Sequence, residues 1–385
     1  MKKISKKQRL ADVNRNLQLR KVIRSTKTLQ KCRKSRKKNR KSTNRFNWKM
    51  FNNWIDQLID SNSINITKLK KNRLVLFLPK VMNFSDQYEA TTLHINVIRK
   101  ITSTTHINAY KLVSVRFNDL LECSTSASLV LTAEISRWDD NIRNQLIPDI
   151  ESWNENILKQ FCELGFFELF KNQPKIEEEP INSALSTVKY IKSHEHDVDK
   201  TIVLKHAIQK IVGEKISKWT FLYTGLSEAI TNVVQHAYPK NTKTADNERY
   251  WYLTASFNKS NSLLKIAFYD QGIGIPRALP SSTKWEKILS YLSKFPIGER
   301  KFHKHLLKAA VEVGRTQTDK SDRGKGLSDM LQFTKQRKDG YLSIMSLKAL
   351  YKYSISNGKS KDKAVSFALE LPGTLIIWCI KLQNI

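Results

Sequence analysis

The chain has 385 residues, of which 40% are hydrophobic and 9% aromatic. This length exceeds one small module and allows about two domains with cores of their own. No apolar run approaches the roughly 18 residues that a membrane-spanning helix needs. Lysine and arginine number 67 against 35 acidic residues, a net charge of +32. Such an excess predicts a polyanionic partner, such as nucleic acid, a nucleotide or an acidic membrane surface.

The start of the chain and the spacing of the cysteines indicate in which cellular compartment the protein lies. Met1-Lys2-Lys3 is basic, but no apolar segment of a secretory signal follows it. The four cysteines lie far apart and have no CxxC or zinc-type spacing. We therefore expect a cytoplasmic protein in a reducing compartment, with no membrane partner.

The positive charge is concentrated at the start of the chain. Residues 1–50 hold 20 lysines and arginines and one acid, Asp12, a net charge of +19. We expect residues 1–45 to form a basic arm that is disordered, because a self-repelling segment has little to bury. Aromatic residues begin only at Phe46, which favours binding to a nucleic-acid backbone over reading of bases. A solvated tail without a specific role is the alternative.

Strands that alternate with helices predict a small α/β domain over residues 46–170. Residues 171–200, with their prolines and the acidic run Glu177-Glu178-Glu179, predict a linker. The expected elements are a helix from Met50, a strand at Leu74–Leu78, a helix around Leu93–Ile101, a strand at Leu112–Phe117, and helices at Ser124–Trp138 and Trp153–Leu164.

Helices followed by an antiparallel meander predict a second α/β domain over residues 201–385. Two helical stretches come first, and the second covers residues 218–237. The expected strands are Tyr250–Phe257, Ser262–Asp270, Tyr341–Leu347, Tyr351–Ser356, Val365–Leu371 and Thr374–Lys381.

The predicted helix at 218–237 has an apolar face and a polar face. Glu228 and Asn232 lie one turn apart on the polar face. An amide oxygen ligates Mg²⁺ well, and a carboxylate one turn away can orient or deprotonate a water beside the metal. A solvated helix face gives the same spacing without a function. The apolar face holds Leu222, Leu226, Ile230, Val233 and Ala237.

A second motif follows the strand that ends at Asp270. Gly272 and Gly274 come directly after this acid, and Pro276 closes the turn. A buried aspartate here can accept a hydrogen bond from the adenine 6-amino group, and glycines let the backbone pass close to a planar base. An ordinary Asp-Gly loop explains the short motif equally well.

Two further segments suit a nucleotide. Asp322–Leu327 is glycine-rich and opens a predicted helix, whose free N–H groups and positive dipole end favour phosphates. Arg323 and Lys325 add positive charge there. Gly373-Thr374 sets a hydroxyl at the start of the last strand, where it can support the adenine contact.

Residues 200–385 resemble the Bergerat-fold ATP-binding domain that gyrase, histidine kinases, mismatch-repair ATPases and anti-sigma-factor kinases share. Four blocks in the family's order carry the resemblance: Glu228-Ala-Ile-Thr-Asn232-Val-Val-Gln-His236-Ala-Tyr238, Asp270-Gln-Gly272-Ile-Gly274, Gly324-Lys-Gly326-Leu327 and Gly373-Thr374. The first of these blocks is most similar to the anti-sigma-factor kinases.

The resemblance implies an α/β two-layer sandwich that binds ATP and Mg²⁺. It implies that Asn232 ligates the metal, that Glu228 positions an attacking water or protein hydroxyl, and that Asp270 reads adenine. Residues 276–322 would form the lid over the nucleotide. The other ATP-binding residues that it implies are His236, Gly272, Gly274, Arg323, Gly324, Lys325, Gly326, Leu327 and Thr374.

The domain at 46–170 resembles the STAS class of anti-sigma-antagonist-like domains. The order of strand, helix, strand, Ser/Thr-rich turn and helix carries this resemblance, together with the ending Leu164-Gly165-Phe166-Phe167. In that family a Ser or Thr at the start of the helix after the second core strand can be phosphorylated. Ser124 and Thr125 are the nearest counterparts, although Cys123 replaces the acid that usually precedes them. A helix cap is the simpler role for these hydroxyls.

Together these observations predict a Mg²⁺-dependent ATP-binding protein that acts as a regulatory switch. It would be a slow ATPase or a Ser/Thr kinase of the anti-sigma type. One alternative is an ATP-gated nucleic-acid-binding module that uses residues 1–45. Another is a protein-interaction switch that binds ATP without hydrolysing it. A regulatory protein partner and a homodimer are both compatible with the sequence.

Overall fold

The computed structural model describes residues 47–104, 106–138, 140–143, 150–174, 184–194, 196–213, 219–239, 249–315, 327–337 and 339–382. By its internal contacts the chain divides into two compact units, Met1–Phe51 and Asn52–Ile385. The predicted basic arm at 1–45 lies outside the described residues. No helix in the described ranges is long and apolar enough to cross a membrane.

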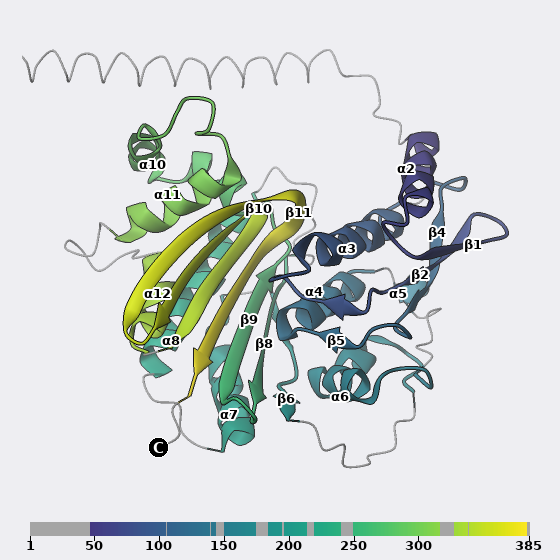
Figure 1. Cartoon of the computed structure of the whole chain (residues 1–385), viewed down its shortest axis with the longest axis horizontal. Helices are drawn as coiled ribbons and strands as arrows, with labels where there is room; N and C mark the ends of the chain where they lie inside the picture. Colours follow the sequence, from purple (N-terminus) through teal and green to yellow (C-terminus); the bar gives the residue numbers. More distant parts are fainter. Residues whose placement is uncertain are drawn as a thin grey trace, which may run out of the picture. The chain divides into compact units, whose positions relative to one another are not determined.

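The second unit is a mixed α/β structure built on a six-stranded antiparallel sheet (Figure 1). The strand order is β10-β11-β9-β8-β6, and β7 pairs with β8 beside β6. The strands are β6 Leu185–Thr187, β7 Ile191–Ser193, β8 Trp251–Asn258, β9 Leu263–Asp270, β10 Gly340–Ser356 and β11 Lys359–Lys381.

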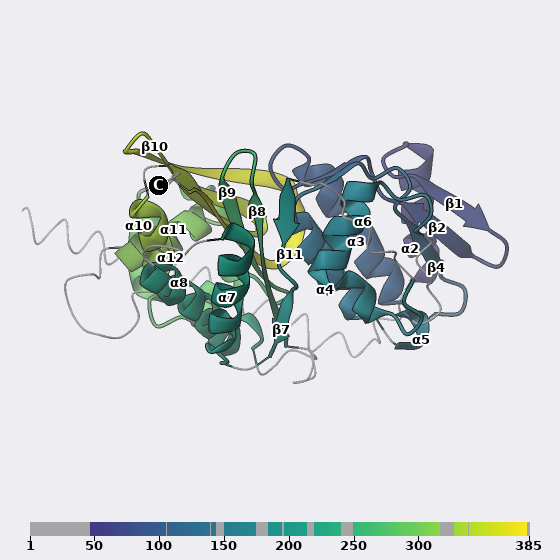
Figure 2. The ribbon, with the colours of Figure 1, turned by 90° about the horizontal axis from the view of Figure 1, so that it is seen from below.

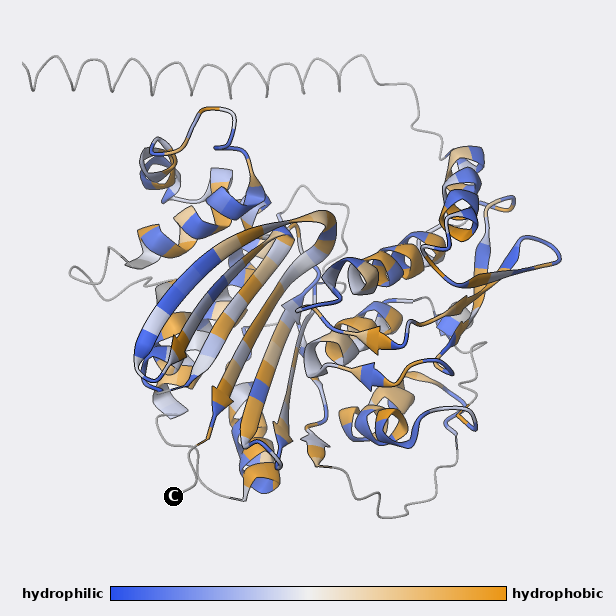
Figure 3. Cartoon of the chain, viewed as in Figure 1, coloured by the Kyte–Doolittle hydropathy of each residue, from blue (hydrophilic) through white to orange (hydrophobic). Residues whose placement is uncertain are grey.

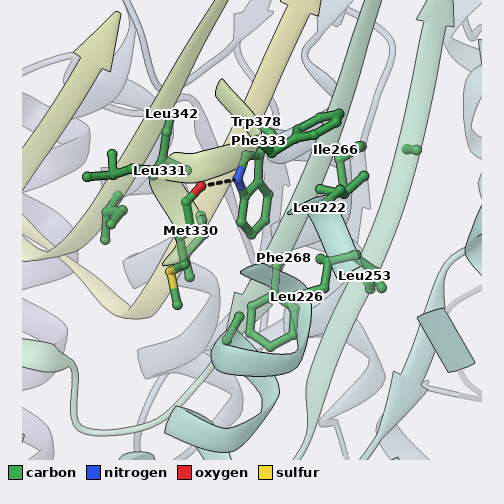
Figure 4. Packing of buried hydrophobic residues seen from close by; sticks show 14 of the residues in the cluster. Leu222, Leu226, Leu253, Ile266, Phe268, Met330, Leu331, Phe333, Leu342 and Trp378 are labelled. Carbon is green, nitrogen blue, oxygen red and sulfur yellow. Dashed lines mark hydrogen bonds between the residues drawn. The ribbon is translucent and has the colours of Figure 1, made fainter. Parts of the chain in front are cut away.

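Helices from the C-terminal half cover one face of this sheet (Figure 2). Trp378 of β11 lies at the centre of the core, and its indole nitrogen donates a hydrogen bond to the backbone oxygen of Met330 at 2.9 Å (Figure 4). Fully burying a side chain of this kind contributes about 1.5–3 kcal/mol. The helices of this half are α7 Lys200–Val212, α8 Trp219–Asn232 with its π-helical extension Val233–Ala237, α9 Ile275–Ala278, the 3-10 turn Leu279–Ser281, α10 Trp285–Leu292, α11 His303–Arg315 and α12 Leu327–Lys335.

The N-terminal α/β part packs on the opposite face of the same sheet. Its helices α3, Tyr88–Thr102, and α4, Thr125–Ser136, contact β11, β9 and β8. All of α4 is buried, because it packs between the central sheet, α3 and the Phe166–Leu169 turn. The remaining elements are α2 Trp48–Asp60, α5 Asp140–Arg143, α6 Glu155–Leu164, a sheet of β1 Ile66–Leu69, β2 Arg73–Phe77 and β4 Lys111–Arg116, and a pair of β3 Val81–Met82 with β5 Glu122–Cys123.

The expected helices, and the expected strands up to Asp270, are present, and the mixed α/β class is confirmed. The segment 171–200 differs from the expected linker, because β6 and β7 lie within it and pair with β8. Their short apolar sequences, Leu185–Thr187 and Ile191–Ser193, give too little periodicity to identify a strand.

The four strands expected after residue 340 are two long, bent strands. The pairing of β10 with β11 shifts register around Leu347, which has a positive φ of 56°. The ribbon then doubles back, and the backbone nitrogen of Asn357 donates to the Asp339 carboxylate beside the start of β10 at 3.1 Å. Figure 1 shows the resulting arch, and Figure 3 shows that its hairpin end is strongly hydrophilic.

Helix α3 holds the bend of this ribbon. The carboxylate of Glu89 accepts hydrogen bonds from the backbone nitrogens of Ala368 and Leu369, at 2.7 and 3.0 Å. The hydroxyl of Tyr88 donates to the backbone oxygen of Leu347 at 3.0 Å. The bulge in β11 thus finds partners for its backbone groups in the N-terminal part.

Candidate functional site

A cavity of about 600 Å³ lies between the polar face of α8 and the segment from Gly274 to Lys284. The end of β9 and the part of β11 at Thr374 and Ile376 form its floor, and α11 and α12 close it further. Its size lies within the range of small-molecule sites. Of the residues predicted from the sequence, those that line it are Glu228, Asn232, His236, Asp270, Gly274, Leu327 and Thr374.

The polar face of α8 forms one wall. The opposite face of this helix is buried through Leu222, Leu226 and Ile230, which fixes the direction of the polar side chains. Asn232 donates a hydrogen bond from Nδ2 to Glu228 Oε1 at 3.1 Å, as the one-turn spacing predicts. This bond does not use the side-chain amide oxygen of Asn232, which can therefore act as a metal ligand or as a hydrogen-bond acceptor.

Burial raises the pKa of Glu228, and the charge of Asp329 adds to this effect. The hydrogen bond from Asn232 and the positive charge of Lys284 act in the opposite direction. A carboxylate with a raised pKa inside a cavity is suited to orienting a nucleophile and accepting its proton.

Asp270 lies on the cavity floor at the end of β9 and is only 4% exposed. Burial raises its pKa to about 7, although hydrogen bonds from the Gly272 amide and the Thr374 hydroxyl oppose this shift. The Gly272 nitrogen donates to Asp270 Oδ1 at 2.8 Å. Thr374 lies directly opposite Asp270 in the pairing of β11 with β9. The pair offers a ligand a buried carboxylate and a hydroxyl side by side.

Ser346 joins the elements around this floor and was not predicted from the sequence. Its hydroxyl donates to the backbone oxygen of Gly373 at 3.1 Å, accepts from the Ile275 nitrogen at 2.9 Å, and lies 3.2 Å from the Thr374 hydroxyl. It thereby joins β11 at Gly373 to the start of α9. One serine in a long apolar strand gives no sequence signal for this role.

The two glycines after Asp270 are required by packing within the protein. A Cβ at Gly272 would lie 2.5 Å from the Cβ of Ala237, and Gly274 has a φ of +80° and would clash with Ser346 and Leu347. The sequence analysis explained these glycines by close approach to a base. The structure gives them a nearer cause, since only Gly274 lines the cavity and Gly272 faces the end of the α8 extension.

The segment Ser281-Ser282-Thr283-Lys284 forms another part of the cavity lining. His236 also lines the cavity. Burial lowers the pKa of this histidine, and the positive charge of Lys284 lowers it further. The sequence analysis treated this segment only as part of a lid. A run of hydroxyl residues that ends in lysine is a signal that could have identified it.

Arg323, Gly324, Lys325 and Gly326, the remainder of the predicted phosphate-binding block, lie outside the described residues. Leu327, the last residue of the block, starts α12 and lines the cavity. The described part of the block is thus next to the other predicted residues.

Ser124 and Thr125 lie on the face of the sheet away from the cavity. Ser124 is the N-cap of α4 and accepts a hydrogen bond from the Ala127 nitrogen at 3.2 Å. The hydroxyl of Thr125 lies 2.5 Å from that of Ser256 in β8 and is 3% exposed. In this arrangement both hydroxyls serve helix capping and packing.

Comparison of the sequence with models of known protein families gives no match. Comparison with curated proteins finds none with significant similarity. The geometry of the cavity is therefore the basis for the function that follows.

Proposed function

We propose that the chain binds ATP with Mg²⁺ in the cavity and acts as a regulatory switch of the Bergerat-fold ATPase superfamily. One observation carries the proposal: predicted residues from separate parts of the sequence line a single cavity of about 600 Å³. Glu228 and Asn232 come from a helix, while Asp270 and Thr374 come from paired strands. Such convergence is not expected if the motifs were unrelated surface features.

In this proposal Asp270 binds the adenine 6-amino group. Its carboxylate is buried and already has one backbone donor, Gly272, so the free acceptor capacity suits an amino group. Thr374, opposite in the sheet, supports the same contact. The apolar neighbours Phe268 and Ile376 line the floor and suit the rest of a base.

The donor set of α8 fits Mg²⁺. Mg²⁺ in nucleotide sites is held by one or two protein oxygens, with phosphates and waters completing the shell. Asn232 offers an amide oxygen beside the Glu228 carboxylate, and the described residues contain no cluster of three or more His, Cys, Asp or Glu that could form a dedicated metal cage. When bound, the metal would neutralise phosphate charge.

We assign Glu228 to the hydrolysis or transfer of the terminal phosphate. Its carboxylate can hold a water or a protein hydroxyl in line with the terminal phosphate and accept its proton. Slow hydrolysis and transfer to a Ser or Thr hydroxyl use the same group. A switch that binds ATP without turnover is the alternative, and release of the terminal phosphate separates the two.

Calorimetric titration of the full chain tests the adenine assignment. We expect wild type to bind Mg·ATP and to bind Mg·GTP more weakly, because guanine lacks the 6-amino donor. Asp270→Ala should lower ATP affinity about 10- to 100-fold, the effect of losing a hydrogen bond to a charged group. Asp362→Ala, in the ribbon and paired with Lys308, is the control and should bind as wild type does. Failure of wild type to bind ATP would contradict the proposal.

A further inference from the structure

The hairpin end of β10 and β11 carries a concentrated positive charge. Residues 348–366, which we call the basic ribbon, hold five lysines and a single acid, Asp362. That acid pairs with Lys308 of α11, at 3.2 Å between Asp362 Oδ2 and Lys308 Nζ. Figure 3 shows the ribbon as a continuous hydrophilic edge. The five lysines are Lys348, Lys352, Lys359, Lys361 and Lys363.

The strand pairing gives the basic ribbon two different faces. Residues directly opposite each other in an antiparallel pair share a face, and successive residues alternate between faces. Tyr351 and Tyr353 lie on one face, are buried, and belong to the same core as Trp378. The core therefore holds the ribbon by this face. The other face carries the cross-strand pairs Lys352–Lys363, Ser354–Lys361 and Ser356–Lys359, of which Lys359, Lys361 and Lys363 are exposed.

Two lysines of the second face lie directly opposite each other. Lys352 and Lys363 are paired across the strands, and like charges in this arrangement destabilise a sheet. Burial lowers the pKa of Lys352, and the charge of Lys363 lowers it further. The Nζ atom of Lys352 lies 3.9 Å from the centroid of the Tyr341 ring, so this lysine is held in place. An anion bound against this face would relieve the repulsion between the two ammonium groups.

The shape of the lysine face suits double-stranded DNA. The major groove of B-DNA is about 12 Å wide and admits a two-stranded β-ribbon. Lys359, Lys361 and Lys363 occupy alternate positions of one strand and span about 13 Å, so they can contact several backbone phosphates. The hydroxyls of Ser354 and Ser356 lie between the lysines and can bind phosphates or base edges.

Other nucleic acids fit the basic ribbon less well. The major groove of double-stranded RNA is too narrow for a ribbon of this kind. Single strands are bound largely by stacking of their bases on aromatic side chains. The two tyrosines of the ribbon, Tyr351 and Tyr353, are buried on the opposite face and cannot stack on a base.

We propose that the basic ribbon binds double-stranded DNA, with its lysine face in the major groove and Lys359, Lys361 and Lys363 on backbone phosphates. This inference does not rest on ATP binding, because no residue of the ribbon lines the cavity. Contacts to phosphates carry no sequence information, so binding should depend strongly on salt and weakly on DNA sequence.

Binding of a fluorescently labelled DNA duplex of about 20 base pairs, two helical turns, to the full-length chain tests the inference. Fluorescence anisotropy at several salt concentrations gives the slope of log affinity against log salt. The ribbon variant, Lys359→Gln with Lys361→Gln and Lys363→Gln, should have a slope shallower by about 3, because each phosphate contact contributes about 0.9. Arginine at the same three positions keeps the charge and should keep the wild-type slope.

A matched control removes the same charge from another surface. Lys70, Lys71 and Lys111 are exposed and lie close together, because the Lys111 nitrogen donates to the backbone oxygen of Asn72 at 2.9 Å. The control variant, Lys70→Gln with Lys71→Gln and Lys111→Gln, should keep the wild-type slope within about 1. Residues 1–45 are intact in every variant, so a difference between the variants reflects the ribbon.

The outcomes decide the inference separately from the proposed function. A shallower slope in the ribbon variant alone, restored by arginine, supports it. Equal slopes in the ribbon and control variants, or failure of wild type to bind the duplex, would overturn it. Unchanged DNA binding by the ribbon variant with loss of binding to phosphatidylserine vesicles would assign the surface to a membrane and also overturn it. None of these results affects ATP binding by the cavity.

Discussion

Gln271 Nε2 donates a hydrogen bond to Glu134 Oε1 at 2.5 Å, and this bond joins the floor of the cavity to the N-terminal part of the protein. Glu134 lies in α4, is 2% exposed, and also accepts hydrogen bonds from the Nε and Nη2 atoms of Arg99 in α3. Gln271 directly follows Asp270. The strand end that we assign to adenine therefore continues into a buried ion pair.

Removing one partner of this ion pair should lower stability strongly. Glu134→Gln leaves the guanidinium of Arg99 without its charged partner, and breaking a buried pair in this way costs about 3–5 kcal/mol. We expect the lower end, because the Arg99 side chain is 24% exposed. Urea unfolding measures the loss. Glu168→Gln breaks the exposed pair with Lys189 and should cost at most about 1 kcal/mol; equal losses in the two variants would contradict the interpretation.

Two glycines with left-handed backbone provide a matched test of packing at the cavity floor. A Cβ at Gly373 would collide with the backbone oxygen of Asp270, whereas Gly358 has nothing within 4 Å of that position. Gly358→Ala should therefore cost only the left-handed penalty of about 1–2 kcal/mol, and Gly373→Ala should cost at least about 2 kcal/mol more. Thermal and urea unfolding compare the variants. Similar losses at both positions would show that the backbone of β11 around Gly373 relaxes without cost.

The affinity for ATP should depend on pH through Asp270. Burial raises the pKa of this carboxyl to about 7, and an amino donor binds the ionised form better, so affinity should rise as the pH rises through 6 and 7 and level off above. The slope cannot exceed about tenfold per unit for one group. Asp270→Asn does not titrate there and should lose this slope. The measurement compares how ATP affinity changes with pH in wild type and in Asp270→Asn. The same change in both proteins would exclude Asp270 as the titrating group.

Glu228 should affect turnover and not binding. Glu228→Gln keeps an oxygen for the bond from Asn232 but cannot accept a proton, so phosphate release or transfer should fall about 100-fold or more while ATP affinity stays within a few-fold. Release of labelled terminal phosphate measures the first quantity, and titration measures the second. Thr224→Val, on the same helix but outside the cavity lining, is the control. Turnover of Glu228→Gln at the wild-type rate would remove the residue from the chemistry.

Much of the site could be predicted because its residues follow local rules. The 3.6-residue period of α8 fixes both the buried Leu226 side and the Glu228–Asn232 pair. Asp270 ends the apolar strand β9, and it is buried at the end of that strand, as the sequence predicts. These patterns need no knowledge of distant contacts.

The remainder depends on contacts between distant segments. The register shift at Leu347 turns β10 and β11 into an arch, and the bulge of β11 is held by Glu89 from α3, about 280 residues away in sequence. The complete burial of α4 likewise follows from packing against the sheet, where Thr125 contacts Ser256. Sequence periodicity carries no information on such partners.

The most direct test of the account is the affinity for ATP with and without Mg²⁺ in wild type and Asn232→Ala. We predict that Mg²⁺ strengthens ATP binding to wild type and that this gain is lost in Asn232→Ala, because we assign the side-chain amide oxygen of Asn232 as the metal ligand. Equal affinities in all four measurements would contradict the assignment of the metal to Asn232.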